Sequence, residues 1–369
     1  MARERTHDVV VAGAGIVGLA CAWRAAQAGM SVLVLDRGDG APGPASTVAA
    51  GMLAPVTEAA FGEHELLRVN LAGRAEWPGF AAELAERSGL DLEYSEAGAL
   101  VAAVDRDDVA ELRRLNELQR SLGLGAEWLT GRECRRLEPG LSPRVSGGVL
   151  APRDGAVDPR AVIRALREVL RGEGVEVRTG IEVLRVEDAG GRVTGLATSR
   201  GALAAERVVV ACGAWSGALH PSAPALRPVK GQIVRLRGEP LAHRIVRTPR
   251  CYVVSRPGGE IVVGATSEEQ GFDTTVTAGA AQRLLEYAWE VLPDVEEREL
   301  VAVEAGLRPV TPDNLPAVAA AGPEGPEGPE GLVWATGHGR GGVLLAPLAA
   351  RTVAELLAGR DAPVAGGVA

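Results

Sequence analysis

Residues 11–18 read Val-Ala-Gly-Ala-Gly-Ile-Val-Gly, which places Gly13, Gly15 and Gly18 in a Gly-x-Gly-x-x-Gly pattern near the start of the chain. In dinucleotide-binding proteins the first glycine permits a tight turn and the second lets the backbone approach a pyrophosphate. The third lets the following helix pack closely against the strand. The pattern alone is weak evidence, so the flanking sequence decides how it is interpreted.

The flanking segments supply the remaining elements of a nucleotide cradle. Residues 8–11 form a short β-branched run, typical of a buried parallel strand, and residues 19–28 are alanine-rich with no helix breaker. A second β-branched run, 31–35, ends at Asp36, about 20 residues after the glycines, where an acid binds the ribose hydroxyls. Strand, turn, helix, strand and acid follow in register. They therefore predict a nucleotide site with its phosphates at the helix N-terminus.

The totals narrow the class of protein. The chain has 369 residues, enough for two domains, and a formal net charge of −9, which argues against a nucleic-acid-binding surface. Its four cysteines lie far apart and its five histidines lack metal-ligand spacing, so we expect no disulfide framework and no metal site. The apolar run 9–23 ends at Arg24 and is too short to cross a bilayer. We therefore expect a cytoplasmic protein that makes no membrane contact.

Hydrophobic periodicity organises the rest of the chain. Helices are predicted at 66–88, at 107–122 and from Asp158-Pro159 to about residue 171, where Asp suits the N-cap and Pro the first helical position. Residues 175–186 and 193–203 predict strands around a glycine turn.

The predicted secondary structure changes in the second half of the chain. Segments between 226 and 266 predict an antiparallel sheet, and residues 323–331, with their Pro-Glu-Gly repeat, predict a surface loop. A glycine-rich turn at 338–342 precedes a final helix predicted at 343–357. Such a turn and helix would place backbone N–H groups at the edge of a flavin ring, at a second phosphate, or in a plain helix cap.

Four blocks together resemble the D-amino-acid oxidase superfamily of FAD-dependent oxidoreductases, and within it the glycine oxidases of thiamine biosynthesis. The blocks are 8–36, Cys212-Gly213, Gly306-Leu307-Arg308-Pro309 and Gly337-His338-x-Arg340-x-Gly342. The resemblance runs from about residue 8 to 357. It implies an α/β fold in which a discontinuous Rossmann-like FAD-binding domain, doubly wound, carries an inserted antiparallel-sheet domain that binds substrate. The expected FAD-binding segments are 1–88, 150–222 and 308–369, the expected substrate-binding segments are 89–149 and 223–307, and a homotetramer is expected.

The resemblance also implies noncovalent FAD, because the family's covalent attachment needs a cysteine in the carboxy-terminal half near the flavin, and none follows Cys251. The residues it places on FAD are Gly13, Ala14, Gly15, Ile16, Val17, Gly18, Asp36, Arg37, Thr47, Ala50, Gly51, Met52, Val183, Cys212, Gly213, Trp215, His338, Gly339, Arg340, Gly341, Gly342 and Val343.

For the substrate, the resemblance implies that Arg308 binds the amino-acid carboxylate and that the Tyr252 hydroxyl helps to bind it. It also implies that Arg340 is a second arginine of the active site. A guanidinium pairs bidentately with a carboxylate, which agrees with the assignment of Arg308. Two positions depart from the family pattern: Gly339 replaces an aromatic residue, and Ser267 stands where an apolar residue borders the substrate side chain. These departures bear on which amine is oxidised.

The implied reaction is oxidative deamination of glycine, and of other small amines or D-amino acids. A hydride passes from Cα to flavin N5, and oxygen reoxidises the flavin to give hydrogen peroxide. The products would be the imine or glyoxylate and ammonia, feeding thiazole formation. Alternatives within the superfamily are a sarcosine, D-amino-acid or proline oxidase or dehydrogenase, and outside enzymes a flavin-binding protein without turnover. A pyridine-nucleotide dehydrogenase is least favoured, since the sequence contains only one complete dinucleotide-binding pattern and its remaining blocks suit FAD.

Overall fold

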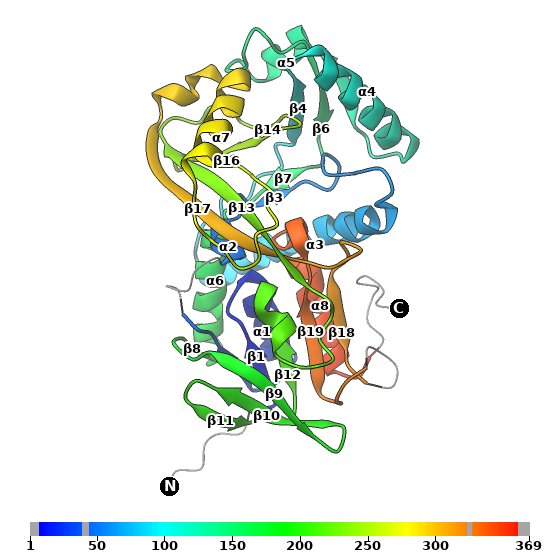
Figure 1. Cartoon of the computed structure of the whole chain (residues 1–369), viewed down its shortest axis with the longest axis vertical. Coiled ribbons are helices and arrows are strands. Elements are labelled where there is room, and N and C mark those ends of the chain that lie inside the picture. The colour runs from blue at the N-terminus through cyan, green and yellow to red at the C-terminus, as the bar shows by residue number, and fades with distance from the viewer. Residues whose placement is uncertain (1–6, 39–43, 323–326, 361–369) are drawn as a thin grey trace.

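Two large β-sheets organise the computed structural model, which describes residues 7–38, 44–322 and 327–360 (Figure 1). Part of the Pro-Glu-Gly repeat, residues 323–326, lies outside the described residues. The helices are α1 (Ile16–Gln27), α2 (Ala45–Val48), α3 (His64–Ser88), α4 (Arg106–Ser121), α5 (Gly131–Leu137), α6 (Pro159–Gly172), α7 (Ala278–Val291) and α8 (Ala346–Leu357). Short 3-10 turns occur at Gly213–Ala218, Pro293–Glu297 and Gly339–Gly341.

The first sheet is the nucleotide-binding sheet predicted from the opening glycines. Its strands follow the order β18-β19-β12-β1-β2-β8, all parallel except the pair β18–β19. They are β1 (Val9–Ala12), β2 (Val32–Leu35), β8 (Glu176–Arg178), β12 (Val208–Val210), β18 (Ala317–Ala320) and β19 (Leu332–Thr336). The central strands are buried on both faces, which explains their continuous apolar sequence.

Different elements cover the two faces of this sheet. Helices α1, α3, α6 and α8 pack on one face, and the three-stranded antiparallel sheet β11-β10-β9 packs on the other. The three strands are β9 (Val183–Ala189), β10 (Arg192–Thr198) and β11 (Gly201–Ala204). The expectation of a doubly wound domain is therefore wrong for the second face. The reason is the hairpin at Gly190-Gly191, where both φ angles are positive: it folds this segment into strands, whose apolar side chains bury β1 and β2.

The second sheet has eight strands in the order β17-β13-β16-β15-β14-β4-β6-β5, antiparallel throughout except for β14–β4. They are β4 (Ala99–Ala103), β5 (Glu127–Thr130), β6 (Gly147–Ala151), β13 (Arg227–Arg237), β14 (Ile245–Arg247), β15 (Tyr252–Ser255), β16 (Glu260–Gly264) and β17 (Glu299–Val310). The predicted antiparallel sheet at 226–266 is confirmed. The long strands β13 and β17 reach from this sheet toward the parallel one (Figure 1). A two-stranded sheet of β3 (Met52–Leu53) and β7 (Gly155–Ala156) completes the described strands.

The predicted helices occur close to their expected positions. Helix α6 begins as predicted, with the Asp158 side chain accepting hydrogen bonds from the N–H groups of Arg160 and Ala161. The final helix begins three residues later than predicted, at Ala346, since Pro347 suits a first turn and residues 339–345 form turns instead. In the part of the chain that the structure describes, no helix is long and apolar enough to span a membrane.

Candidate functional site

A cavity of about 770 Å³ runs along the carboxyl ends of the parallel strands and beneath the eight-stranded sheet. This volume lies in the upper part of the range usual for ligand sites, about 300–1,000 Å³. Every residue that the sequence assigned to cofactor or substrate lines the cavity except Gly18 and Gly341. The structure thus brings together residues that lie more than 300 positions apart in the chain.

The opening glycines form a closely packed turn at one end of this cavity. Gly13 has a φ of +107°, and a Cβ there would lie 2.4 Å from the carbonyl oxygen of Ala211. A Cβ on Gly18 would lie 2.0 Å from the carbonyl oxygen of Gly13, so Gly18 serves helix packing without reaching the cavity. Side chains are therefore excluded at the two glycines for steric reasons, as the sequence predicted.

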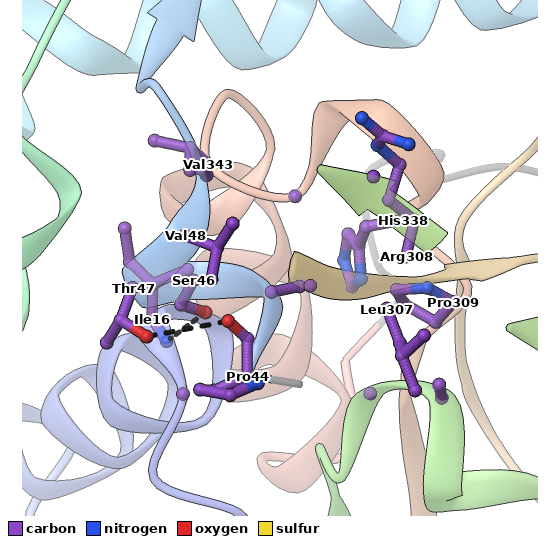
Figure 2. A pocket seen from close by; sticks show the side chains of 18 of the residues that line it. Ile16, Pro44, Ser46, Thr47, Val48, Leu307, Arg308, Pro309, His338 and Val343 are labelled. Carbon is purple, nitrogen blue, oxygen red and sulfur yellow. Dashed lines mark hydrogen bonds between the residues drawn. The ribbon is translucent and has the colours of Figure 1, made fainter. Parts of the chain in front are cut away.

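The N-terminus of α1 faces the cavity with few capping groups. Gly15 provides no side-chain cap and the first turn holds no acidic residue. The Ile16 N–H donates to the Ser46 hydroxyl oxygen at 3.1 Å (Figure 2). The partial positive charge of this helix end is thus available to a phosphate. The resemblance placed Thr47 and residues 50–52 on the cofactor, but this contact of Ser46 depends on tertiary structure and has no signal in the sequence.

Asp36, which the sequence predicts to bind the ribose, holds the glycine turn in the structure. One of its carboxylate oxygens accepts the Ala14 N–H at 2.8 Å and the other accepts the Gly38 N–H at 2.7 Å. These bonds fix the glycine turn against the end of β2, and each carboxylate oxygen keeps a lone pair for a further donor. Nearby, the Arg37 guanidinium lies 3.6 Å from the centre of the Trp215 ring, which places both of these residues at the same end of the cavity.

The strip 47–50 is held by arginines that sequence analysis did not single out. Arg160 and Arg235 both donate to the Thr47 carbonyl oxygen at 2.8 Å, and Arg256 donates to the Ala50 carbonyl oxygen at 2.6 Å. Arg235 and Arg256 are buried, and both are paired with Glu260. In a chain so rich in arginine no local pattern distinguishes these residues, so only the fold identifies them.

The two residues assigned to the substrate carboxylate lie over glycines of neighbouring strands. A Cβ on Gly231 would lie 2.4 Å from Nη2 of Arg308, and a Cβ on Gly264 would lie 2.3 Å from the Tyr252 hydroxyl. Tyr252 is directly opposite Gly264 across β15–β16, while Arg308 of β17 is opposite Val229 of β13, two residues from Gly231. The glycines leave a flat surface on which the guanidinium and the phenol extend toward each other.

The charge state of this pair suits an anion. Nη1 of Arg308 donates to the Thr266 carbonyl oxygen at 3.1 Å, and within residues 7–38, 44–322 and 327–360 no carboxylate forms an ion pair with it. Burial raises the pKa of Tyr252, an effect that the charge of Arg308 partly opposes, so the phenol stays protonated and can donate. One positive charge and one hydroxyl donor therefore face the cavity together.

The other predicted active-site arginine has carboxylate partners. Arg340 forms an ion pair with Glu63, and its Nε lies 3.8 Å from Oε2 of Glu58. Glu58 also pairs with Arg247, whose Nη1 lies 3.1 Å from Oε1, and both of these residues line the cavity. Arg340 therefore lines the site as part of a charge cluster. Glu58 and Arg247 are site residues for which the sequence offered no signal.

The glycine-rich turn after β19 lies beside the end of β17. His338 forms a β-bridge with Val310, and in Figure 2 its ring lies on the same side of the cavity as Arg308, opposite Ser46 and Thr47. The ring is 4 % exposed, and burial lowers its pKa to about 4, so it is neutral at pH 7. A neutral ring adds no charge to the site, so on this side of the cavity the positive charge comes from Arg308.

A parallel sheet with a helix N-terminus that faces the cavity at its carboxyl edge defines a dinucleotide-binding protein. The second sheet, which holds an arginine ready for an anion against the same cavity, adds a substrate-binding surface. The chain belongs to the DAO family of FAD-dependent oxidoreductases, whose model matches residues 8–356.

Individual relatives agree with this family. The glycine oxidase of Geobacillus kaustophilus is 35% identical to this chain, over 95% of this chain and 93% of the relative. A crystal structure of glycine oxidase from that organism matches with a TM-score of 0.89 at 33% identity, covering 97% of this chain and 96% of that chain. A bifunctional ThiO/ThiG protein of Trichormus variabilis is 33% identical over 95% of this chain and 53% of its own length. The structure of iminodiacetate oxidase from Chelativorans sp. BNC1 matches with a TM-score of 0.85 at 26% identity, covering 96% of each chain.

Proposed function

We propose that this chain is an FAD-dependent oxidase of small amino acids that deaminates glycine. The observation that carries the proposal is the arrangement of Arg308, which has no carboxylate partner in the described chain, and the protonated Tyr252 in the cavity that contains the glycine turn. The glycine oxidase and ThiO names of the relatives support glycine as the substrate and delivery of the product to thiazole formation in thiamine biosynthesis.

The chain's own residues fit FAD. Gly13 and Gly15 with the N-terminus of α1 would hold the pyrophosphate, Asp36 the adenosine ribose, and residues 47–52 with 338–343 the ring system. Bound FAD would supply the two-electron acceptor, and oxygen would be the final acceptor. Two cysteines line the cavity, but burial raises the pKa of Cys212 to about 12 and that of Cys251 to about 11. Neither is a thiolate at neutral pH, which supports noncovalent binding.

In this proposal the protein contributes mainly position. Arg308 binds the carboxylate through two parallel hydrogen bonds and Tyr252 donates a third, so that the substrate's Cα–H has one orientation in the cavity. The strip 47–50, held by Arg160, Arg235 and Arg256, keeps the cofactor side of the cavity in a fixed place relative to Arg308. No side-chain base is required, since an amine that has lost its proton assists departure of the Cα hydrogen with its own lone pair.

We further propose the domain division expected from the sequence, a cytoplasmic location and a homotetramer. The division is supported by the origin of the strands: the parallel sheet draws on residues 9–35, 176–178, 208–210 and 317–336, and the eight-stranded sheet on residues 99–151 and 227–310. Exposed apolar side chains on the edge strand β17, Leu300 and Val301, support contact with another copy.

Anaerobic bleaching of the bound flavin's visible absorption tests the proposal. Glycine, sarcosine, D-alanine, D-proline and L-proline are added in turn to the holoenzyme. Fast bleaching by glycine that is lost in Arg308→Ala, and kept in the exposed control Arg192→Ala, supports the proposal. Bleaching by a proline but not by glycine would assign the chain to the proline-oxidising alternative. A flavin that none of these amines reduces would leave a binding protein without turnover and would refute the proposal.

A further inference from the structure

A second guanidinium lies on the same face of the eight-stranded sheet as Arg308 and Tyr252. Arg247 of β14 is directly opposite Tyr252 across the pair β14–β15, so the two side chains leave the sheet on the same face. Both line the cavity, and Arg247 is 20% exposed. A row of residues on this face therefore crosses five neighbouring strands, from β14 through β15, β16 and β13 to β17, with a cation at each end. Its members are Arg247, Tyr252, Gly264, Gly231 and Arg308.

The two cations of this row differ in one respect. Arg308 has a backbone carbonyl as its hydrogen-bond partner, whereas Nη1 of Arg247 lies 3.1 Å from Oε1 of Glu58. The second oxygen of Glu58 lies 3.8 Å from Nε of Arg340. Glu58 is only 13% exposed and lines the cavity, so one carboxylate faces both arginines at the substrate end.

Hydrogen bonds hold Glu58 in this place. The preceding residue, Thr57, donates its N–H and its hydroxyl to the buried carboxylate of Asp154, and Val56 donates its N–H to the same group. Gln119 donates to the Val56 carbonyl oxygen at 2.9 Å. These four hydrogen bonds hold the backbone before Glu58 in place. Because the backbone has little freedom to move the side chain into solvent, the Glu58 charge stays in the cavity.

We propose that Glu58 is a specificity-determining residue that restricts the cavity to amines with a single acid group. Because Glu58 already pairs with Arg247 and lies against Arg340, Arg308 is the guanidinium of the row that lacks a carboxylate partner among the described residues. A second carboxylate would have to displace Glu58 from its arginines or lie beside it without a cation of its own. Substrates such as iminodiacetate and D-aspartate are thereby excluded. The physical reason is that a like charge in a partly dry cavity disfavours the wrong ligand more strongly than added contacts favour the right one. This inference rests on the proposed function for its substrate class.

Matched pairs of amines test the inference. Iminodiacetate differs from sarcosine, and D-aspartate from D-alanine, by one carboxylate replacing a hydrogen of a methyl group. We expect the wild-type kcat/KM to favour the monoacid of each pair by at least 100-fold. Glu58→Gln should reduce this preference at least tenfold for one pair, because it uncovers Arg247 for the second acid group.

The matched control is Glu63→Gln. Glu63 also pairs with Arg340 and carries the same charge, but it is not among the residues that line the cavity. We expect its monoacid preference to stay within twofold of the wild-type value. An equal change in both variants would mean that the overall charge of the cluster matters rather than the position of Glu58, and it would overturn the inference.

Ligand binding provides a readout that needs no turnover. Acetate and malonate are titrated into the holoenzyme, and their dissociation constants are read from the change in the flavin spectrum. We expect wild type to bind acetate at least tenfold more tightly than malonate, and Glu58→Gln to lose this preference. If no amine is oxidised but this pattern holds, the proposed function fails and the inference stands. A wild type that binds malonate as tightly as acetate overturns the inference, even if the variant does not fold.

Discussion

Gly231→Ala should move the arginine that binds the carboxylate without removing it. The new Cβ would lie 2.4 Å from Nη2 of Arg308, whereas ordinary contacts begin at 3.4 Å, so the guanidinium must shift by about 1 Å. A displacement of about 1 Å at a reacting centre lowers the rate by about 100-fold, or about 2.7 kcal/mol. Gly231 is in a β-strand with an ordinary backbone conformation, so alanine adds no backbone strain.

The assay for this variant compares kcat/KM for glycine and the dissociation constant of acetate in the holoenzyme. Both should worsen by similar factors, because acetate has only the carboxylate that Arg308 binds. Gly79→Ala is the control, since its Cβ would meet no atom within 4 Å. A Gly231→Ala enzyme that retains flavin and the wild-type melting temperature, yet has kcat/KM within threefold of wild type, would refute the reasoning.

Three further predictions concern the cofactor cradle and stability. Gly13→Ala should release flavin and lower the melting temperature, because its Cβ meets a backbone oxygen at 2.4 Å; Gly62→Ala, with positive φ but open space, should retain flavin absorbance. Arg235→Met should lower the free energy of unfolding in urea by about 3 kcal/mol, because it removes a buried cation that pairs with two glutamates and donates to the Thr47 carbonyl oxygen, whereas Arg192→Met at an exposed pair should cost under about 1 kcal/mol. The pKa of His338 is lowered to about 4, so below pH 6.5 the unfolded chain takes up a proton that the folded chain resists. Between pH 7.5 and pH 5 the wild type should therefore lose about 2 kcal/mol of stability that His338→Gln retains, as measured by urea unfolding at both pH values. Equal losses in both proteins would contradict this assignment.

The elements that the sequence predicted well are those whose signals are local. The turn at Gly13, the helix that follows it and the N-cap at Asp158 depend on residues within a few positions of one another. The antiparallel segments between 226 and 266 were likewise identified from alternation along single strands. The doubly wound expectation failed because which layer covers a sheet depends on contacts between distant segments.

At the substrate end of the cavity, too, contacts between distant segments could not be predicted from the sequence. Arg308 was identified through the block Gly306-Leu307-Arg308-Pro309, but Arg247 and Glu58 have no distinguishing neighbours in the sequence. Nor does a glycine in a strand reveal that it leaves space for a side chain of the next strand, as Gly231 does for Arg308. Such relations follow from strand order and register, and one residue of slip would turn these side chains to the other face.

The sequence by itself determined the nucleotide cradle, because steric and conformational demands at a turn are met by a few adjacent residues. It also determined the DAO-family resemblance through short blocks in a fixed order. Only the tertiary structure decided which charges remain available. An arginine's role depends on whether a carboxylate reaches it, and here Arg340 and Arg247 are neutralised by Glu63 and Glu58 while Arg308 has a carbonyl partner. That difference arises from long-range packing, which places these charges together at one end of the cavity.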